Sequence, residues 1–215
     1  MGLFITFEGI EGCGKTTQIK MVGKYLDNRN ISYIITEEPG GSSLGLKIRE
    51  ILLNKSSFEI CAESELFLFS AARAQHVKEV ILPALEGGEI VLCDRFFDAT
   101  IAYQGSGREL DMNFIRQINA ISAGHLKPDM TFLFDIPVEI GLKRAMGRIS
   151  RIKNAPREDR FESEKIEFHK KVREGYLSLA KSEPERFRVI DGTKDILTVH
   201  REVCSQVVAL IDGRG

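Results

Sequence analysis

Five short apolar runs punctuate the chain, and each is separated from the next by a segment long enough to contain helices. The runs cover residues 3–7, 33–36, 90–93, 130–134 and 187–190. Continuous apolar runs of this length are typical of strands buried on both faces of a sheet. In other segments, mostly apolar residues recur every three to four positions, as on one face of a helix. This spacing is clearest at Phe161, Lys165, Phe168, Val172, Tyr176 and Leu179, and at Ile196, Val199, Val203, Val207 and Leu210.

Strands that alternate with helices predict an α/β fold, in which a five-stranded parallel sheet carries helices on both faces. About eight helices fit into the intervening segments. No linker or shift in composition divides the chain, so we expect residues 1–215 to form one domain. Ligands of such sheets bind beyond the carboxyl ends of the strands. That edge would carry the residues after the first strand, residues 38–41, Asp94, Arg95 and Asp135.

A glycine-rich motif follows the first predicted strand. Residues 9–16 fit the pattern G-x-x-x-x-G-K-[ST], and a helix-like run follows at 17–26. In this context main-chain N–H groups and a helix N-terminus surround phosphate oxygens. Lys15 would reach the β- and γ-phosphates, and the Thr16 hydroxyl would coordinate a phosphate-bound Mg²⁺. The alternative is a chance glycine-rich turn, which the strand before it and the helix after it disfavour.

Composition narrows the classes of partner. The formal net charge of −1 argues against non-specific binding to nucleic acid or to membrane surfaces. The four cysteines have no metal-ligand spacing, and no apolar run approaches the roughly 18 residues that span a bilayer. The first residues also lack the pattern of a secretory leader. We therefore expect a reduced, cytoplasmic and soluble protein.

The third predicted strand ends in a carboxylate, Asp94, with Arg95 next to it. In phosphate-loop proteins a carboxylate at this place holds Mg²⁺, usually through water. A helix cap or turn is the alternative for a strand-end Asp alone. Thr16 and Asp94 are therefore the candidate metal residues.

Three helix-spaced groups contain candidates for recognising a base or a phosphate. Thr100, Tyr103 and Gln104 would share one helix face, which is suited to a base edge or, alternatively, is simply solvated. Phe69 and Arg73 are four residues apart, so the ring could stack on a base while the guanidinium bonds its carbonyl. Phe69 alone would more simply be a core residue. Nearer the edge of the sheet, Arg49 is compatible with either a phosphate ligand or a solvated charge.

A basic cluster occupies the segment around 144–162. Arg144, Arg148 and Arg151 would lie on one helix face. Arg157 and Arg160 come after Pro156. Such a run is often only solvated, and like charges on one face repel unless an anion is present. Phosphoryl transfer needs a movable source of positive charge, which a lid interrupted by proline would supply.

Taken together, these motifs resemble those of the bacterial thymidylate kinases. The resemblance runs nearly end to end and is carried by residues 7–17, 38–41, 48–52, 71–76, 94–96, 102–105 and 159–162. It implies a three-layer P-loop kinase fold with a short arginine-rich lid at about 144–162. It also implies a homodimeric cytoplasmic enzyme that phosphorylates dTMP to dTDP with MgATP, a step in dTTP synthesis, by direct in-line transfer.

Carried over position by position, the resemblance implies roles for individual residues. Glu11 would contact the deoxyribose, Arg49 and Arg95 would hold the dTMP phosphate, Phe69 would stack on thymine, and Arg73 would bond its O4. The dTMP site would consist of Glu11, Glu38, Arg49, Phe69, Arg73, Arg95, Thr100, Tyr103 and Gln104. The ATP site would consist of Gly9, Ile10, Glu11, Gly12, Cys13, Gly14, Lys15, Thr16 and Thr17. The catalytic cations would be Lys15, Arg95 and the lid residues Arg148, Arg151, Arg157 and Arg160.

At two places the chain departs from the family pattern, which limits how far the family's residue roles apply to it. The family commonly has an arginine where this chain has Glu37, so the local charge is reversed. The lid is also longer than usual between Gly147 and Asp159, which leaves the catalytic lid arginine open. Another nucleoside or nucleoside monophosphate kinase remains an alternative, and so does a nucleotide-dependent switch, although the chain lacks the Asn-Lys-x-Asp motif that reads guanine in GTPases.

Overall fold

A parallel five-stranded sheet forms the centre of the molecule. The computed structural model describes residues 2–54, 58–150 and 160–213. The strands are β1 (Leu3–Glu8), β2 (Tyr33–Glu37), β3 (Ile90–Asp94), β4 (Met130–Asp135) and β5 (Phe187–Asp191). Their order in the sheet is β2-β3-β1-β4-β5, and every pairing is parallel. Each predicted strand is confirmed, and each extends one residue further than its apolar run because it ends in a carboxylate-bearing residue.

Nine α-helices and two π-helical segments occur within the described ranges. The α-helices are α1 (Lys15–Asp27), α2 (Ser43–Leu53), α3 (Ala62–His76), α4 (Leu82–Glu86), α5 (Phe97–Thr100), α6 (Met112–Ser122), α7 (Val138–Ile149), α8 (Ile166–Ser182) and α9 (Ile196–Asp212). The π-helical segments are η1 (Val77–Ile81) and η2 (Ile101–Gly107). The helix expected from the spacing at 161–179 begins only at Ile166, because Phe161 lies in a turn and packs edge-on against Tyr103.

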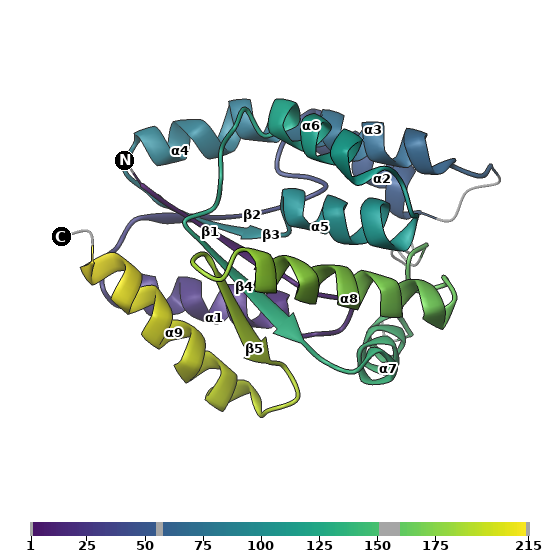
Figure 1. The fold of residues 1–215 in the computed structure, drawn as a ribbon. Coiled ribbons are helices and arrows are strands. Elements are labelled where there is room, and N and C mark those ends of the chain that lie inside the picture. Colours follow the sequence, from purple (N-terminus) through teal and green to yellow (C-terminus); the bar gives the residue numbers. More distant parts are fainter. Residues whose placement is uncertain (1, 55–57, 151–159, 214–215) are drawn as a thin grey trace.

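The helices cover the sheet in two layers. In Figure 1, α1 and α9 lie at the lower left, α3, α4 and α6 lie above the strands, and α5 and α8 lie to their right. The short α5 continues into η2, which packs along α8. None of the helices that the structure describes is long and apolar enough to cross a membrane.

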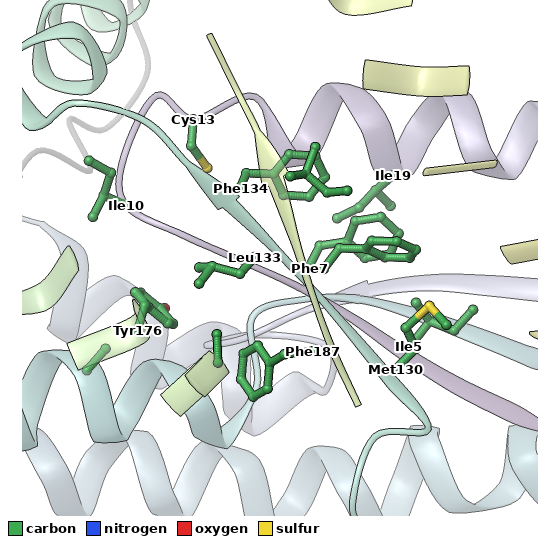
Figure 2. Packing of buried hydrophobic residues seen from close by; sticks show 14 of the residues in the cluster. Ile5, Phe7, Ile10, Cys13, Ile19, Met130, Leu133, Phe134, Tyr176 and Phe187 are labelled. Atoms are coloured by element: carbon green, nitrogen blue, oxygen red, sulfur yellow. The ribbon is translucent and has the colours of Figure 1, made fainter. Parts of the chain in front are cut away.

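The central strand contributes to both layers of the core. Figure 2 shows Phe7 beside Ile19 of α1 and Phe134 of β4, and the Phe7 and Phe134 rings stack with centroids 6.2 Å apart. Phe4 faces the other layer and meets Phe96 edge-on at 4.9 Å. This two-sided burial is why the three central strands β1, β3 and β4 are mostly apolar, whereas Ile35 of β2 and Val189 of β5 at the sheet edges are half exposed.

The carboxyl ends of the central strands lie at one level. In the sheet register Phe7 is opposite Asp94, and Asp94 is opposite Glu37. The loop after β1 and the turn after β3 therefore emerge side by side. The glycine-rich loop and Asp94, predicted to bind phosphate and Mg²⁺, therefore lie next to each other at this edge.

Candidate active site

The glycine-rich loop connects β1 to the first turn of α1. Gly12 has φ +71°, and a Cβ there would stand 2.1 Å from the carbonyl oxygen of Gly141, so no other residue fits without a backbone shift. Helix α1 begins at Lys15, whose side chain is 8% exposed and whose Nζ is 3.5 Å from the Gly9 carbonyl oxygen. A helix N-terminus and a lysine therefore converge here, which makes the loop an anion site.

Thr16 and Asp94 come together at the start of α1 and the end of β3. The Thr16 hydroxyl donates a hydrogen bond of 2.7 Å to Asp94 Oδ2. Among the described residues no cluster of three His, Cys, Asp or Glu side chains could hold a metal. Two hard oxygen donors beside a phosphate loop nevertheless fit Mg²⁺, because this ion takes few protein ligands and fills its shell with water and phosphate oxygens.

Two pockets flank this pair. The first, called here the arginine pocket, is lined by Glu11, Gly12, Lys15, Thr16, Glu37, Glu38, Pro39, Arg49, Leu53, Phe69, Arg73, Asp94, Arg95, Phe96, Ala99, Thr100, Tyr103, Gln104, Arg148, Phe161 and Glu162. The second, the loop pocket, is lined by Gly12, Cys13, Gly14, Lys15, Thr16, Thr17, Gln18, Arg144, Arg148, Gly192, Lys194, Ile196 and Val199. Gly12, Lys15, Thr16 and Arg148 line both. A group passing between the pockets would meet these four residues.

Arg73 lies at the base of the arginine pocket and is 1% exposed. Its Nε donates to Glu38 Oε2 at 2.8 Å, its Nη1 to Asn119 Oδ1 at 3.0 Å, and its Nη2 to Thr100 Oγ1 at 2.9 Å. A buried guanidinium bonded on three sides has a fixed orientation, because each lost contact would leave a buried polar group unpaired.

Arg95 follows β3 with φ +71°, a left-handed conformation that is uncommon for arginine. Its guanidinium donates to Tyr176 Oη at 3.2 Å and to Glu11 Oε1 at 3.1 Å, and it lies over the Tyr103 ring. Burial would lower the pKa of Arg95, but the nearby phenols of Tyr103 and Tyr176 and the carboxylate of Glu11 outweigh it and raise this pKa above its usual value. The cation is thus permanently charged and held at the rim.

Glu11 is a buried carboxylate that lines the arginine pocket. Burial alone would raise its pKa, but the His169 imidazole, whose Nδ1 lies 3.4 Å from Oε2, and the charges of Arg95 and Lys15 outweigh it, so the pKa lies well below the usual range. Tyr103 donates a short hydrogen bond to the same carboxylate. Glu11 is therefore ionised at neutral pH.

Glu8 lies behind this surface and is fully buried. Its Oε1 accepts from the Phe96 main-chain N–H at 2.7 Å, and its Oε2 accepts from the Tyr176 hydroxyl at 2.7 Å. Burial, assisted by the negative charge of Asp98, raises the pKa of Glu8 to about 8. The carboxyl thus supports the turn and the phenol that hold Arg95.

The residues expected to read a base all line the arginine pocket. Phe69 is half-buried: it packs against the core and also lines the pocket. Thr100, Tyr103 and Gln104 are each at most 5% exposed, which excludes the solvated helix face. Gln104 Nε2 donates to Glu65 at 2.7 Å. All nine residues of the predicted dTMP site therefore meet in one pocket.

Arg49 and Glu37 form an ion pair at the mouth of the arginine pocket. Arg49 Nη1 lies 3.1 Å from Glu37 Oε2 and donates to the Pro39 carbonyl oxygen at 2.8 Å. Half of the Glu37 side chain is exposed to solvent. The carboxylate that departs from the family pattern thus sits beside a cation predicted to bind phosphate.

The arginines of the basic cluster have different surroundings. Arg148, at the end of α7, lines both pockets with its side chain 59% exposed, and its Nη2 is 3.8 Å from Glu162 Oε1. Arg160 lines neither pocket, because its guanidinium bonds to the Leu52 carbonyl oxygen and to Glu65. Arg151 and Arg157 lie outside the described residues.

The predicted nucleotide loop divides between the loop pocket, the core and, for Glu11, the arginine pocket. Residues 12–17 line the loop pocket. Ile10, 3% exposed, packs in the core, as Figure 2 shows, so only its main chain could approach a phosphate.

Sequence reasoning missed most of the far wall of the loop pocket. Arg144, Gly192, Lys194, Ile196 and Val199 line it, and Arg144 Nη1 donates to the Gly192 carbonyl oxygen at 3.1 Å. Gly192 follows the last strand, so the rule that sites form beyond strand ends could have found it. In the arginine pocket, the sequence indicates the buried Glu162 only as one residue of the segment 159–162.

The chain closely matches known proteins along its length. Residues 7–203 match the family model described as Thymidylate kinase. A curated relative with that name from Syntrophus aciditrophicus is 57% identical over 98% of this chain and 96% of its own length. One from Desulfovibrio desulfuricans is 48% identical, with coverage of 99% and 98%. The crystal structure of thymidylate kinase from Ehrlichia chaffeensis superposes with a TM-score of 0.72 at 34% identity, covering 96% of this chain and 98% of that one.

Proposed function

Because the chain belongs to the thymidylate kinase family, which phosphorylates dTMP to dTDP with ATP, we propose that the γ-phosphoryl group passes directly between the two pockets described above. One observation supports this most strongly. The two pockets share Gly12, Lys15, Thr16 and Arg148, so donor and acceptor phosphates bound on either side would meet at cations. In-line transfer needs that alignment more than it needs a base, since the acceptor phosphate is already anionic.

We assign dTMP to the arginine pocket. Arg95 and Arg49 lie toward the shared residues and would bind its phosphate, while Arg73 and Thr100 lie at the base with a polar edge for thymine. The half-buried Phe69 would stack on the ring. Glu11 and Tyr103 would face the deoxyribose.

We assign ATP to the loop pocket. The N–H groups at the start of α1 and the Lys15 ammonium would surround its phosphates. The half-exposed Arg144 side chain and the apolar Ile196 and Val199 provide a wall on which the base could lie. Thr17 and Gly14 complete the floor.

The Thr16 hydroxyl and the Asp94 carboxylate would hold Mg²⁺ together with the ATP phosphates. When bound there, the ion would supply positive charge that offsets the charge of the ATP phosphates. Lys15 and Arg95 supply fixed positive charge from opposite sides, and Arg148 supplies charge that can move with its exposed side chain. Among the described lid arginines, Arg148 is the one we assign to the chemistry, and Arg160 to holding the lid against Glu65.

A coupled assay with ATP, Mg²⁺ and an acceptor panel of dTMP, dUMP, dCMP, AMP and thymidine tests the assignment. We expect turnover with dTMP to exceed that with every other acceptor. Transfer from ATP with a chiral γ-thiophosphoryl group should invert the configuration at phosphorus. Retention would instead require a covalent enzyme intermediate and would contradict direct transfer.

We also propose a single-domain cytoplasmic homodimer. All four cysteines are free, as a reducing compartment would keep them. Phe67 of α3 and Phe114 of α6 are 49% and 40% exposed and contact each other edge-on, and Ile121 on α6 is 74% exposed. An apolar surface of this kind suits a second copy. Sedimentation of the wild type and of Phe67→Glu tests this, with a dimer expected for the first and a monomer for the second.

A further inference from the structure

His76 ends α3 and is completely buried, yet it lines neither pocket. Both of its ring nitrogens are engaged. Nδ1 lies 3.0 Å from Glu38 Oε1, and Nε2 lies 2.6 Å from the Thr36 hydroxyl. A neutral imidazole satisfies both contacts if Nδ1–H donates to the carboxylate and Nε2 accepts from threonine. The ring thus connects the end of β2 to the carboxylate that follows it.

Two residues of α3 hold the two oxygens of Glu38. His76 binds Oε1, and Arg73, three residues earlier on the same side of the helix, binds Oε2 at 2.8 Å. Glu38 is 6% exposed, and its main-chain N–H donates to the Asp94 carbonyl oxygen at 3.0 Å. With both oxygens and the main chain held, the carboxylate has one orientation.

The surrounding chain is shaped to the imidazole. Gly41 has φ +72°, and a Cβ at this position would lie 2.2 Å from His76 Cδ2. The turn after β2 therefore packs directly against the ring. His76 cannot swing away without moving this turn.

The orientation of Glu38 sets that of Arg73. The guanidinium is bonded by Glu38 at Nε, by Asn119 at Nη1 and by Thr100 at Nη2. Arg73 and Thr100 form the polar end of the arginine pocket. If the Glu38 carboxylate rotates about its Cγ–Cδ bond, its hydrogen bond with Arg73 Nε is lost. The Arg73 guanidinium then tilts with respect to the pocket.

We propose that His76 is a positioning residue for base selectivity, which acts by locking Glu38 and thereby aiming Arg73 at the base. The inference rests on the proposed role of Arg73 in reading the base. A guanidinium offers only donors, so it accepts a pyrimidine with a carbonyl at position 4 and rejects one with an amino group there. A correctly aimed Arg73 therefore favours dTMP over dCMP, and a tilted one loses part of that preference.

Two substitutions at His76 separate its two hydrogen bonds. His76→Asn places an amide nitrogen near the Nδ1 position and keeps a donor for Glu38. His76→Gln places its amide near the Nε2 position, keeps a partner for Thr36 and leaves Glu38 Oε1 without one. Asparagine is the smaller residue, so general loss of packing would harm it more.

We expect His76→Gln to raise the KM for dTMP about tenfold and to lower the dTMP/dCMP ratio of kcat/KM by a similar factor, with the KM for ATP unchanged. His76→Asn should keep both parameters within about twofold of wild type even where its Tm is lower. If His76→Gln does not fold, His76→Phe replaces it, because the ring volume is kept and both hydrogen bonds are lost. The expected result is the same loss of selectivity.

Controls decide between the possible failures. His200 on α9, whose ring contacts Cys204 at 3.5 Å, receives the same Asn and Gln substitutions and should leave selectivity unchanged. Thr36→Val removes the hydroxyl and should lower Tm with little change in selectivity. Equal loss of selectivity in the Asn and Gln variants of His76, or none in either, overturns the proposal. If Arg73→Ala also leaves the KM for dTMP unchanged, the base-reading role itself fails; if it raises that KM, only the His76 inference fails.

Discussion

The cations that line only the arginine pocket are held differently from those that line both pockets. Arg73 is 1% exposed and has hydrogen bonds on three sides, and Arg95 is fixed by Glu11 and Tyr176. In the region that the two pockets share, the Lys15 Nζ makes a long, weak contact of 3.5 Å with the Gly9 carbonyl oxygen, and the Arg148 side chain is 59% exposed.

This difference indicates which half of the site is formed in advance. Buried, bonded guanidinium groups lose little freedom when a ligand arrives, so the acceptor side is already organised. The exposed guanidinium of Arg148 gains little from its protein partner and can move to a phosphate as it binds. Recognition of the acceptor would thus be built into the fold, whereas charge neutralisation would be completed by binding.

Replacing Lys15 with methionine tests the shared region most severely. The side chain keeps its length and loses the charge that faces the transferred phosphate. We expect kcat to fall by about a thousandfold or more with little change in Tm. Near-normal turnover in a steady-state assay would refute the role of the loop.

Arg148→Ala removes the exposed cation that lines both pockets. We expect kcat to fall about a hundredfold, with smaller changes in the KM for either substrate. Arg160→Ala is the matched comparison, because Arg160 bonds to Leu52 and Glu65 and should change Tm more than kcat. The reverse pattern would move the chemistry to Arg160.

Arg73→Ala tests the preorganised side. Losing a charge-assisted contact to the base should raise the KM for dTMP roughly tenfold to thirtyfold, with the KM for ATP unaffected. The buried Glu38 would lose its cation, so we also expect stability to fall by about 3 kcal/mol. Calorimetry and steady-state kinetics measure the two effects separately. An unchanged KM would count against base reading.

The buried Glu8 gives the fold a pH dependence. Its pKa is raised to about 8 from 4.5, so the folded state keeps a proton that the unfolded state releases. The contribution of Glu8 to the free energy of unfolding should be complete below about pH 4.5. It should decrease as the pH rises toward 8, by at most about 1.4 kcal/mol per pH unit. Glu8→Gln should flatten this slope in denaturant titrations between pH 5 and 8. An unchanged slope would mean that other groups cause it.

Glu37→Gln should have the smallest effect. Glu37 is half exposed, and its ion pair with Arg49 competes with an incoming phosphate. We expect the KM for dTMP to decrease about twofold to threefold at low salt and the difference to shrink at high salt. A higher KM would instead show that Glu37 helps to orient Arg49.

Local patterns were sufficient for much of the fold and the loop. All five strands are as the apolar runs predict: the central ones because residues buried on both faces must be apolar, and the edge strands β2 and β5 because they keep apolar residues even where Ile35 and Val189 are half exposed. The spacing at 161–179 predicts a helix that starts too early, because Phe161 is buried in a turn and not on a helix face. Spacing alone cannot tell these two kinds of burial apart.

Chemistry that follows from a residue's own neighbours along the chain was therefore determined by the sequence: the phosphate loop, the carboxylate after β3 and the membership of one family. Tertiary structure alone decided how side chains far apart in the sequence pair. It placed Arg148 in both pockets and Arg160 in neither, and it joined His76 to Glu38 across 38 positions. The physical reason is that hydrogen bonds and burial depend on distance in space, which no local pattern specifies.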